Sequence, residues 1–529
     1  MIRYKPSSQL SLEGFKTPFS HQLSATNRWV VLAQKIPWDK LAAVYYRKMR
    51  SDFGAPMLDA RMVIGAVIIK HMLCIDDREV LQQISENMYL QYFVGLSGFQ
   101  PEPPFDASLL VTIRKRLGKD AMEELNEVIL REAGVLNGPA RKEESDSGQK
   151  GNKQNKEGED QGTNKGEEKA GSGADEQEPG KPSGTMLIDA TVAEQQVAYP
   201  TDLNLLNAGR EHLERMILKG CGVMGMPAPR MYSEIARRSY LSVAKSKRKS
   251  RTAVRRGIRQ QLQYVKRDLG YIDRLVEQSE LFRLSLDKRD WKLLMVIHEL
   301  YRQQRWMYKK QEHSIADRIV NLYQPHVRPM PRGKDRVSTE FGSKQLVILK
   351  DGYAHVCVLD WYNFNDGTYL EQALEKYRDL YGCYPERVLG DRLFGSRENR
   401  RLMKEKGILF VGKSLGRPSA AQREKERSLH KEMTARNPIE GKFGQGKNAY
   451  GSAKIRARLR ETSESWVMAI YLVMNLVKLV QTRASSFIAA LFALLYGTAQ
   501  RLRAWHEKLS KTTGNRGGTP IYIRFQIIA

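Results

Sequence analysis

The stretch RVLGDRLFGSRENR, residues 387–400, decides which class of fold the chain can adopt. The segment ERVLGD (386–391) has the composition of a strand and closes on a carboxylate, Asp391. The following SRENRRLMKEKG predicts a helix that Gly407 stops, and ILFVG (408–412) predicts one more strand. Strands that alternate with helices are typical of an α/β sheet, where ligands and metals gather at strand ends. An acid at such an end is therefore a candidate functional residue.

Upstream of this stretch, further strand patterns complete a sheet. KQLVILK (344–350) and AHVCVLDWY (354–362), joined through the turn signal DGY, predict a hairpin, and GTYLEQALEKYRDLYG (367–382) predicts a helix. Earlier, 186–188 leads into Asp189 and reads as a strand that ends in an acid. Residues of about 203–335 read as helical without clear strands. The order predicts an α/β fold: a mixed sheet with helices on its faces and a large all-helical insertion after its first strand.

The N-terminal part, 25–135, reads as mostly helical. RMVIGAVIIKHMLCI (61–75) is apolar almost all round and predicts a core helix, after which Asp76 and Glu79 resemble a capping box that opens DREVLQQISENMYLQYF. Further on, Asp106 could cap a short helix that carries Arg114, Lys115 and Arg116. Several short helices that end in a basic one could form a helix-turn-helix-like DNA reader, although generic helical packing explains the pattern nearly as well.

Residues 141–184 have a different composition. Their only apolar residue is alanine, which occurs twice, so this segment cannot bury enough surface to offset chain entropy and is expected to be a disordered linker. Its net charge is −3, so the rest of the chain carries +30 of charge against a total of +27. The basic character therefore belongs to the parts that fold.

The bulk composition favours a soluble protein with a polyanionic partner. A length of 529 residues suits about two to four domains, 41% hydrophobic residues is ordinary, and a charge of +27 favours nucleic acid, with a merely soluble basic protein as the alternative. The segment KSKRKSRTAVRRGIR (245–259) concentrates this charge without any acid. If helical, its cations wrap around more than one face, which favours a phosphate-tracking surface over a solvated stripe. These cations are Lys245, Lys247, Arg248, Lys249, Arg251, Arg255, Arg256 and Arg259.

The sequence gives no indication of export, disulfides or zinc. The four cysteines are far apart without a C-x-x-C pair, and the first residues, MIRYKPSSQLSLEGF, lack an apolar signal core, so a reducing cytoplasm fits. The apolar region WVMAIYLVMNLVKLVQTRASSFIAALFALLYG is interrupted by polar residues before it reaches the roughly 20 residues of a membrane span. We expect one or two buried helices there, and no membrane partner.

Three acids suggest a metal site. If the strands that end in Asp189 and Asp391 are neighbours, their carboxylates converge at one sheet edge. The segment TARNPIEGKFGQGKNAYG (434–451) offers a third acid, Glu440, in the first turn of a helix that Asn437 could cap, although a plain surface ion pair explains Glu440 equally well on its own. Such carboxylates can hold two divalent metals about 3.5–4 Å apart, and hard oxygen ligands suit Mg²⁺ or Mn²⁺.

The ordered set Asp189, Asp391 and Glu440 resembles that of the DDE transposases of bacterial insertion sequences, in particular the ribonuclease-H-like enzymes of the insertion-sequence-four and -five groups. The segments LIDATVAEQQVAYPTD, YPERVLGDRLFGSRENRRLMKEKGILFVGKSLGRP and RNPIEGKFGQGKNAYG resemble the blocks around the three acids. KHMLCIDDREVLQQISENMYLQYFVGL resembles the family's helical N-terminal domain. In the Glu block, Arg436, Glu440 and Lys447 match the family's spacing, whereas Met433 stands where the family often has Tyr.

The resemblance implies a function and a set of roles. The chain would be a bacterial DNA transposase, found in the cytoplasm with the nucleoid, that cleaves at terminal inverted repeats and joins the freed 3′ ends to target DNA. Asp189 would bridge two Mg²⁺ or Mn²⁺ ions, and Asp391 and Glu440 would each hold one. Arg436 and Lys447 would contact DNA phosphates, and the protein would act on double-stranded DNA as a homodimer. The alternative is an inactive relic that still binds DNA.

The resemblance also implies a domain plan. Residues 1–140 would be a helical domain that binds DNA ends, and 141–184 the linker. Residues 185–480 would be a ribonuclease-H-like catalytic domain with the helical insertion at about 203–335, and 481–529 a helical C-terminal tail.

Overall fold

The computed structural model describes residue 16 and residues 22–49, 57–139, 181–331, 339–413 and 434–482. The linker prediction at 141–184 lies almost wholly outside this part, as does the C-terminal tail from 483. Two compact units divide the chain, Met1–Asn475 and Leu476–Ala529. All that follows concerns the first unit, except where the helix Arg460–Thr482 runs past its end.

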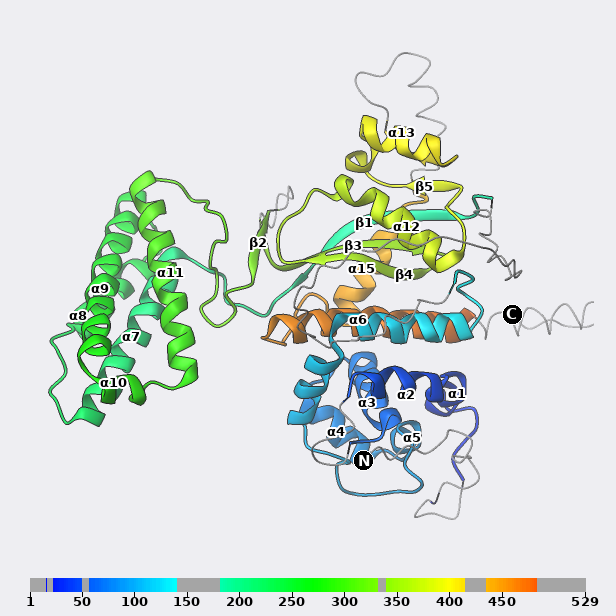
Figure 1. The fold of residues 1–529 in the computed structure, drawn as a ribbon, viewed down its shortest axis with the longest axis horizontal. Coiled ribbons are helices and arrows are strands. Elements are labelled where there is room, and N and C mark those ends of the chain that lie inside the picture. The colour runs from blue at the N-terminus through cyan, green and yellow to red at the C-terminus, as the bar shows by residue number, and fades with distance from the viewer. Residues whose placement is uncertain are drawn as a thin grey trace, which may run out of the picture. The chain divides into compact units, whose positions relative to one another are not determined.

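Six helices form the N-terminal part, at the bottom of the view in Figure 1. The buried helix α3 lies at its centre because its sequence is apolar on all sides, as expected. Asp76 caps α4 by accepting from the amides of Arg78 and Glu79. The single helix expected after Asp76 is wrong, because Asn87 interrupts it and caps α5 with its own side chain. The six helices are α1 (Arg28–Lys35), α2 (Trp38–Arg47), α3 (Ala60–Leu73), α4 (Asp77–Glu86), α5 (Met88–Phe93) and α6 (Ser108–Glu132).

The expected basic reader helix does not stand alone. It is the first half of α6, which continues past a kink at Gly118, where φ is 64°. Arg114 is 3% exposed and donates both guanidinium arms to Asp77, so it supports the fold. Lys115 and Arg116 remain exposed on this helix.

A mixed sheet of six strands follows (Figure 1). The order is β2-β3-β1-β5-β6, and β4 pairs with β3 beside β2. Pairing is antiparallel from β1 to β3, β3 to β4 and β2 to β3, and parallel from β1 to β5 and β5 to β6. The strands are β1 (Thr185–Glu194), β2 (Arg328–Pro331), β3 (Thr339–Lys350), β4 (Tyr353–Asp360), β5 (Arg387–Leu389) and β6 (Leu409–Val411).

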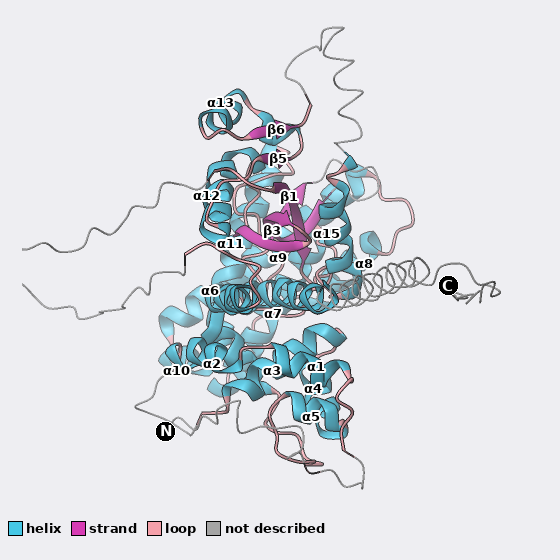
Figure 2. Cartoon of the chain, turned by 90° about the vertical axis from the view of Figure 1, so that its right-hand side faces the viewer, coloured by secondary structure: helices cyan, strands magenta, loops and turns pink. Residues whose placement is uncertain are grey.

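Helices cover both faces of this sheet. The helix α12 (Leu370–Tyr381) packs against β4, and α15 (Asn437–Ala449) packs against β1. Figure 2 shows these two helices on opposite sides of the strands. The short 3₁₀ turns η2 (Asp366–Tyr369) and η3 (Arg392–Gly395) precede α12 and α13 (Arg397–Glu405), and α13 lies beside β6. The predicted mixed α/β sheet is thus confirmed, as is the hairpin of β3 and β4, whose turn residues Asp351 and Gly352 both have positive φ.

The insertion between β1 and β3 is a helical bundle, as expected, but it is shorter than 203–335. Its helices are α7 (Asp202–Met224), α8 (Ser233–Ala244), α9 (Arg251–Gln278), α10 (Glu280–Ser285) and α11 (Lys288–Lys310). The expectation of no strand there is wrong, because β2 follows at Arg328–Pro331. Its two prolines obscured it in the sequence, since proline is tolerated only on an edge strand.

One helix in the described residues, Arg460–Thr482, is long and apolar enough to cross a membrane, but 72% of its apolar window is buried within the structure. This burial agrees with the internal helix that the sequence predicted for the region after Trp466. The second apolar stretch, from 483, lies outside the described residues.

Candidate active site

Asp189 lies on β1, and Asp391 follows β5, the parallel neighbour of β1. The register of β1 with β5 runs from Thr185 opposite Arg387 to Leu187 opposite Leu389. Asp189 comes two residues after Leu187, and Asp391 two residues after Leu389, so both acids occupy the same level of the sheet. The predicted adjacency of the two strands is therefore confirmed.

The prediction that Asp189 ends its strand is wrong. β1 continues to Glu194, and Asp189 pairs with Val347 of β3 in its middle. What ends near Asp189 is β5, whose last residue is Leu389. The Asp189 side chain accepts a hydrogen bond of 2.8 Å from the Ala190 amide. Asp189 thus lies at a level of β1 where β3 is still paired on one side but β5 has ended on the other.

Asp391 begins a tight turn immediately after β5. Its carboxylate accepts a hydrogen bond of 2.8 Å from the Leu393 amide and so caps η3. Gly390 makes the turn possible, because a Cβ there would lie 2.9 Å from the buried ring of Phe394 and 3.1 Å from Ile188. The cap occupies one carboxylate oxygen, so Asp391 is fixed at the strand end by the local backbone.

Glu440 comes from α15, in the first turn of the helix as predicted. The predicted cap is wrong: Asn437 is already helical, Arg436 is the N-cap residue, and no side chain caps the helix. Glu440 is 59% exposed and forms an ion pair of 2.9 Å with Arg436. The simple surface ion pair that the sequence left open is therefore present.

The three acids share one electrostatic environment. Burial raises the pKa of Asp189, and the negative charges of Asp391 and Glu440 raise it further. The Ala190 hydrogen bond and the positive charge of Arg436 oppose this rise. Both expected partners therefore lie within electrostatic range of Asp189.

The donor set suits a hard divalent cation, since carboxylate oxygens are the ligands that Mg²⁺ and Mn²⁺ prefer. A cation would also offset the charges of Asp391 and Glu440, which add to the burial that raises the pKa of Asp189. The side chains are not gathered around one point, however. Within the described ranges, no three His, Cys, Asp or Glu side chains are close enough to hold a metal ion. Glu440 would have to turn from Arg436 to join the other two acids.

A cavity of about 530 Å³ opens beside Asp391. Its walls come from the ends of β5 and β6 and from the start of α15, and its cations are Arg392, Lys413 and Arg436. Sequence reasoning missed Lys413; the signal was a lysine directly after the strand ILFVG. The cavity places a carboxylate among three cations, an arrangement that suits a phosphate ester near a metal-binding group.

Comparisons with known proteins agree with this geometry. Residues 388–477 match the family described as Transposase DDE domain, and residues 18–116 match the family described as Transposase domain (DUF772). Together these matches support a DDE transposase of bacterial insertion sequences. The first match contains Asp391 and Glu440. Asp189 lies outside it, so the assignment of Asp189 to the candidate site depends on the sheet register.

One curated relative of the chain is "Uncharacterized protein ORF8 in nfe locus" of Rhizobium meliloti, which is 38% identical over 117 residues. The match covers 22% of the chain and 54% of the relative, so the chain spans about half the length of the relative it matches. No solved structure matches.

Lys447 contacts two acids. Its ammonium group lies 3.0 Å from Glu340 of β3 and 3.4 Å from Glu194 of β1. Because Lys447 lies on α15, these contacts fasten the helix that carries Glu440 to the strand that carries Asp189.

The arginines that follow Asp391 make different contacts. Arg392 lines the cavity, whereas Arg400 donates to the carbonyls of Gly395 and Lys413 and lies over the ring of Phe410. Arg401 lies 3.6 Å from Glu405. Arg400 therefore braces the backbone between the Asp391 turn and the end of β6.

The basic segment lies in the helical insertion. It is helical only in its second part, because α8 ends at Ala244 and α9 begins at Arg251. Lys245, Lys247, Arg248 and Lys249 occupy the connection, and Arg251, Arg255, Arg256 and Arg259 lie on α9. All eight side chains are exposed.

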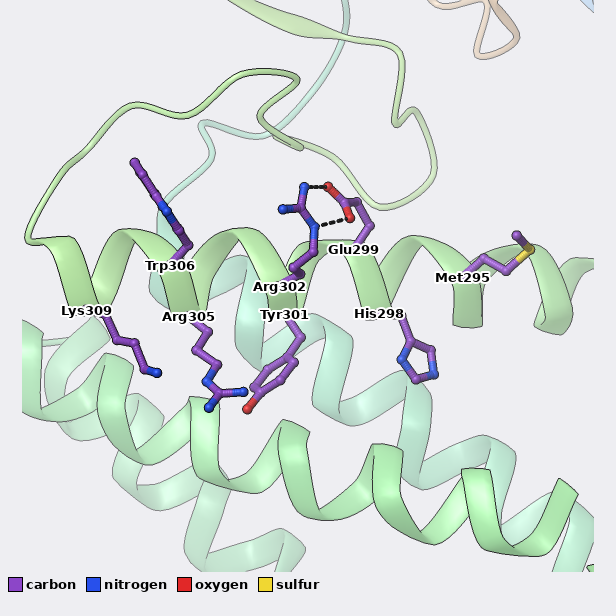
Figure 3. A pocket seen from close by; sticks show the side chains of 8 residues that line it. All are labelled: Met295, His298, Glu299, Tyr301, Arg302, Arg305, Trp306 and Lys309. Atoms are coloured by element: carbon purple, nitrogen blue, oxygen red, sulfur yellow. Dashed lines mark hydrogen bonds and ion pairs between the residues drawn. The ribbon is translucent and has the colours of Figure 1, made fainter. Parts of the chain in front are cut away.

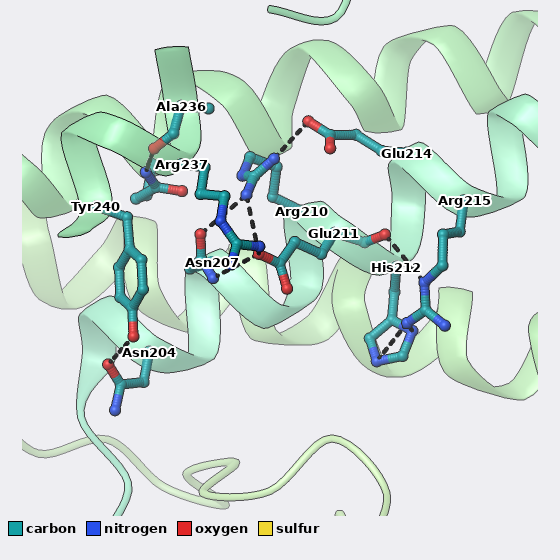
Figure 4. Close-up of polar contacts among 11 residues, drawn as sticks. Asn204, Asn207, Arg210, Glu211, His212, Glu214, Arg215, Ala236, Arg237 and Tyr240 are labelled. Atoms are coloured by element: carbon teal, nitrogen blue, oxygen red, sulfur yellow. Dashed lines mark hydrogen bonds and ion pairs between the residues drawn. The ribbon is translucent and has the colours of Figure 1, made fainter. Parts of the chain in front are cut away.

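Two other features of the insertion do not resemble a catalytic site. Figure 3 shows a cavity of about 740 Å³ on α11, where Glu299 is already paired with Arg302. Figure 4 shows polar contacts along α7, where buried Arg210 donates to Glu214 and Asn207. Both sets of contacts lie within one helix: the Glu299–Arg302 pair is exposed on α11, and the contacts of Arg210 satisfy a buried charge on α7.

Proposed function

We propose that the chain is a DNA transposase that cleaves at the terminal inverted repeats of an insertion sequence and transfers the freed 3′ ends to target DNA. The observation that carries this proposal is the shared level of Asp189 and Asp391 on neighbouring parallel strands, with Glu440 on a helix packed against β1.

A ribonuclease-H-like catalytic fold is part of the proposal. Its support is the sheet itself: three consecutive antiparallel strands, β1, β3 and β4, followed by two parallel strands on the other side of β1. In this arrangement the first strand is central and carries Asp189, and the fourth main strand carries Asp391 at its end.

Asp189, Asp391 and Glu440 would hold one or two Mg²⁺ or Mn²⁺ ions. A bound ion supplies charge stabilisation at the phosphate and a more acidic water or 3′-hydroxyl. The chain's own residues would bind and orient the DNA around it. Arg436 and Lys413 would contact phosphates from the cavity beside Asp391, and Arg436 would release Glu440 as it turns toward the DNA.

Lys447 and the eight cations of 245–259 complete the proposed DNA contacts. Lys447 would have to leave Glu194 and Glu340 to reach a phosphate, so its first effect is on the position of α15. The cations of 245–259 are exposed and ready to bind. A homodimer that joins both DNA ends, with the N-terminal helices at those ends, is the assembly that we expect.

A cleavage assay tests the proposal. Purified protein is mixed with supercoiled plasmid that carries the ends flanking the gene, in Mg²⁺, Mn²⁺ or EDTA. We expect metal-dependent nicking at the ends, and a loss of at least about 100-fold in Asp391→Asn, because the amide lacks the charge that holds a metal.

Asp360→Asn is the matched control. Asp360 also ends a strand, but its carboxylate caps the backbone of Trp361 and Tyr362, so its loss should leave nicking nearly unchanged in folded protein. Binding without cutting by the intact protein in every metal would instead favour the DNA-binding relic.

A further inference from the structure

The connection between α8 and α9 encloses a second polar cavity, of about 610 Å³. Three of its lining residues are cations, Arg248, Lys249 and Arg256, and none of the described residues that line it is acidic. Hydroxyl groups form much of the remaining wall, from Ser239, Ser242, Ser246, Ser250 and Thr252. Cations without a competing carboxylate are the chemistry that binds a phosphate.

The shape of this connection is fixed by its own hydrogen bonds. The Ser246 hydroxyl donates to the carbonyl of Arg248 at 2.8 Å, which sets the backbone that presents Arg248 and Lys249. Ser250 caps α9 by accepting from the Ala253 amide at 3.2 Å. On the α8 side, the Ser239 hydroxyl donates to Gln260 at 2.6 Å. The cations thus lie on a loop that its own hydrogen bonds hold in one conformation, which lowers the entropic cost of binding.

The surroundings indicate a polymer rather than a single anion. All eight cations of 245–259 are exposed, and the positive surface continues from the loop onto the first turns of α9. Arg255 is held in place over the ring of Tyr308 on α11, at 4.4 Å. A run of exposed cations around a cavity that three of them line matches the repeated charge of a nucleic-acid backbone.

The basic connection lies at the end of the bundle where the chain enters from β1. Tyr240 of α8 donates a hydrogen bond of 2.9 Å to Asn204 in the first turn of α7. Gly257 of α9 lies against Leu203, because a Cβ added to this glycine would be 3.3 Å from the Leu203 side chain. Asp202 of α7 accepts a hydrogen bond from Gln304, near the end of α11. The first turn of α7, the last turns of α11 and the α8–α9 connection therefore meet at one end. Both connections from the bundle to the sheet start there.

We propose that the α8–α9 connection is a binding site for the phosphodiester backbone of duplex DNA, with one phosphate held in the cavity by Arg248, Lys249 and Arg256. This inference rests on the proposed function for the identity of the polymer. The site is sequence-independent, because every group that it offers recognises phosphate and none is arranged to read bases.

A binding assay tests the inference without cleavage. A labelled 30-base-pair duplex of arbitrary sequence is titrated with full-length protein in EDTA at several salt concentrations, beside the triple variant Arg248→Gln, Lys249→Gln, Arg256→Gln. We expect the variant to bind at least about tenfold more weakly. The slope of its log affinity against log salt concentration should become shallower by roughly 0.9 for each phosphate that the variant no longer neutralises.

The control triple variant removes the same charge elsewhere, by Arg283→Gln, Lys288→Gln and Arg289→Gln. These exposed residues adjoin the far end of α9, whose 28 residues span about 40 Å at roughly 1.5 Å each. We expect less than about a twofold change. Equal weakening by both triples would show a general charge effect and overturn the inference.

A single variant addresses the cavity itself. Thr252 is the second residue of α9, where an acid favours the helix, so Thr252→Glu should fold normally while repelling phosphate from the cavity. Its control, Leu281→Glu, places an acid at the same position of α10. We expect Thr252→Glu, but not Leu281→Glu, to weaken DNA binding. If Thr252→Glu binds DNA as tightly as the wild type, the proposal is overturned.

The outcomes separate this site from the proposed function. Wild-type cleavage together with unchanged binding by the triple variant would overturn the phosphate site alone. Weak binding by the triple variant without cleavage by the wild type would overturn the transposase activity alone. Preferential binding of an RNA duplex of the same sequence, abolished in the triple variant, would overturn the assignment to DNA.

Discussion

At the scale of single residues, two acids reach one level of the sheet for different local reasons. Asp391 is fixed by the end of β5 and by the cap that it makes on η3. Asp189 lies inside β1, held by antiparallel pairing with β3. Burial raises the pKa of Asp189, and the charges of Asp391 and Glu440 add to that rise, so the ionised form of this acid is disfavoured in the folded protein.

Asp189→Asn should therefore stabilise the metal-free protein at pH 7. The folded state binds the Asp189 proton more strongly than the unfolded state does, so stability falls as pH rises from the ordinary value of 3.8 through the raised pKa. The neutral amide avoids this loss. We expect a higher melting temperature than wild type at pH 7 in EDTA, and no gain below the ordinary pKa.

The exposed Asp120→Asn serves as the control for this comparison, because no interaction partner of its side chain is present among the described residues. It should leave the melting temperature unchanged at both pH values. A lower melting temperature for Asp189→Asn than for the wild type at pH 7 would contradict the raised pKa of Asp189.

At the scale of elements, the helix Arg460–Thr482 connects the N-terminal helices to the sheet. Its Trp466 ring lies under the Lys70 ammonium at 4.1 Å and near Arg114 at 5.3 Å, and both cations pair with Asp77. Further along, Asn475 bonds the amide and carbonyl of Ala354 on β4. The same helix thus contacts both parts through buried polar groups.

Asp77→Asn should loosen this connection. Burial alone would raise the pKa of Asp77, but the hydrogen bond and charge of Arg114, with Lys70, hold it at about 2. The stabilisation is present above the ordinary pKa and is lost as pH falls toward about 2. Removing the charge leaves two buried cations unpaired and should cost about 3–5 kcal/mol, seen as an earlier calorimetric transition.

The adjacent Asp76→Asn provides the matched control. Asp76 is exposed and caps α4, and asparagine caps as well as aspartate, so the transition should move little. Equal effects of the two variants would indicate that the N-terminus of α4, rather than the buried cluster, sets the stability.

At the scale of the whole molecule, positive charge dominates. The net charge is +27, and a concentrated part of it lies at one end of the helical insertion. Binding to arbitrary duplex DNA should therefore weaken by at least about 100-fold between 50 and 200 mM salt, because released counterions drive it. Anisotropy measurements in EDTA give the slope, and an affinity that is independent of salt would contradict a phosphate-dominated interface.

The sequence by itself determined most of the strands and helices, and it marked Asp189, Asp391 and Glu440 as candidate site residues. Strand formers around 386–391 and 408–412, the hairpin turn at Asp351 and the all-apolar run of α3 are local signals, and local signals survive in the structure. It failed where neighbours compete: Asn87 interrupts a helix whose periodicity looked continuous, α6 continues past Gly118 where a short helix was expected, and β2 was hidden by its prolines.

Only the tertiary structure decided what the side chains face. Arg114 reads as a DNA contact in sequence but is buried on Asp77, and Lys447 matches a phosphate contact but lies between Glu194 and Glu340. Lys413 joined the site only because β6 ends beside β5. Charge and periodicity are properties of the chain, whereas partners depend on which strands pair, and pairing is set by packing across more than a hundred residues of sequence.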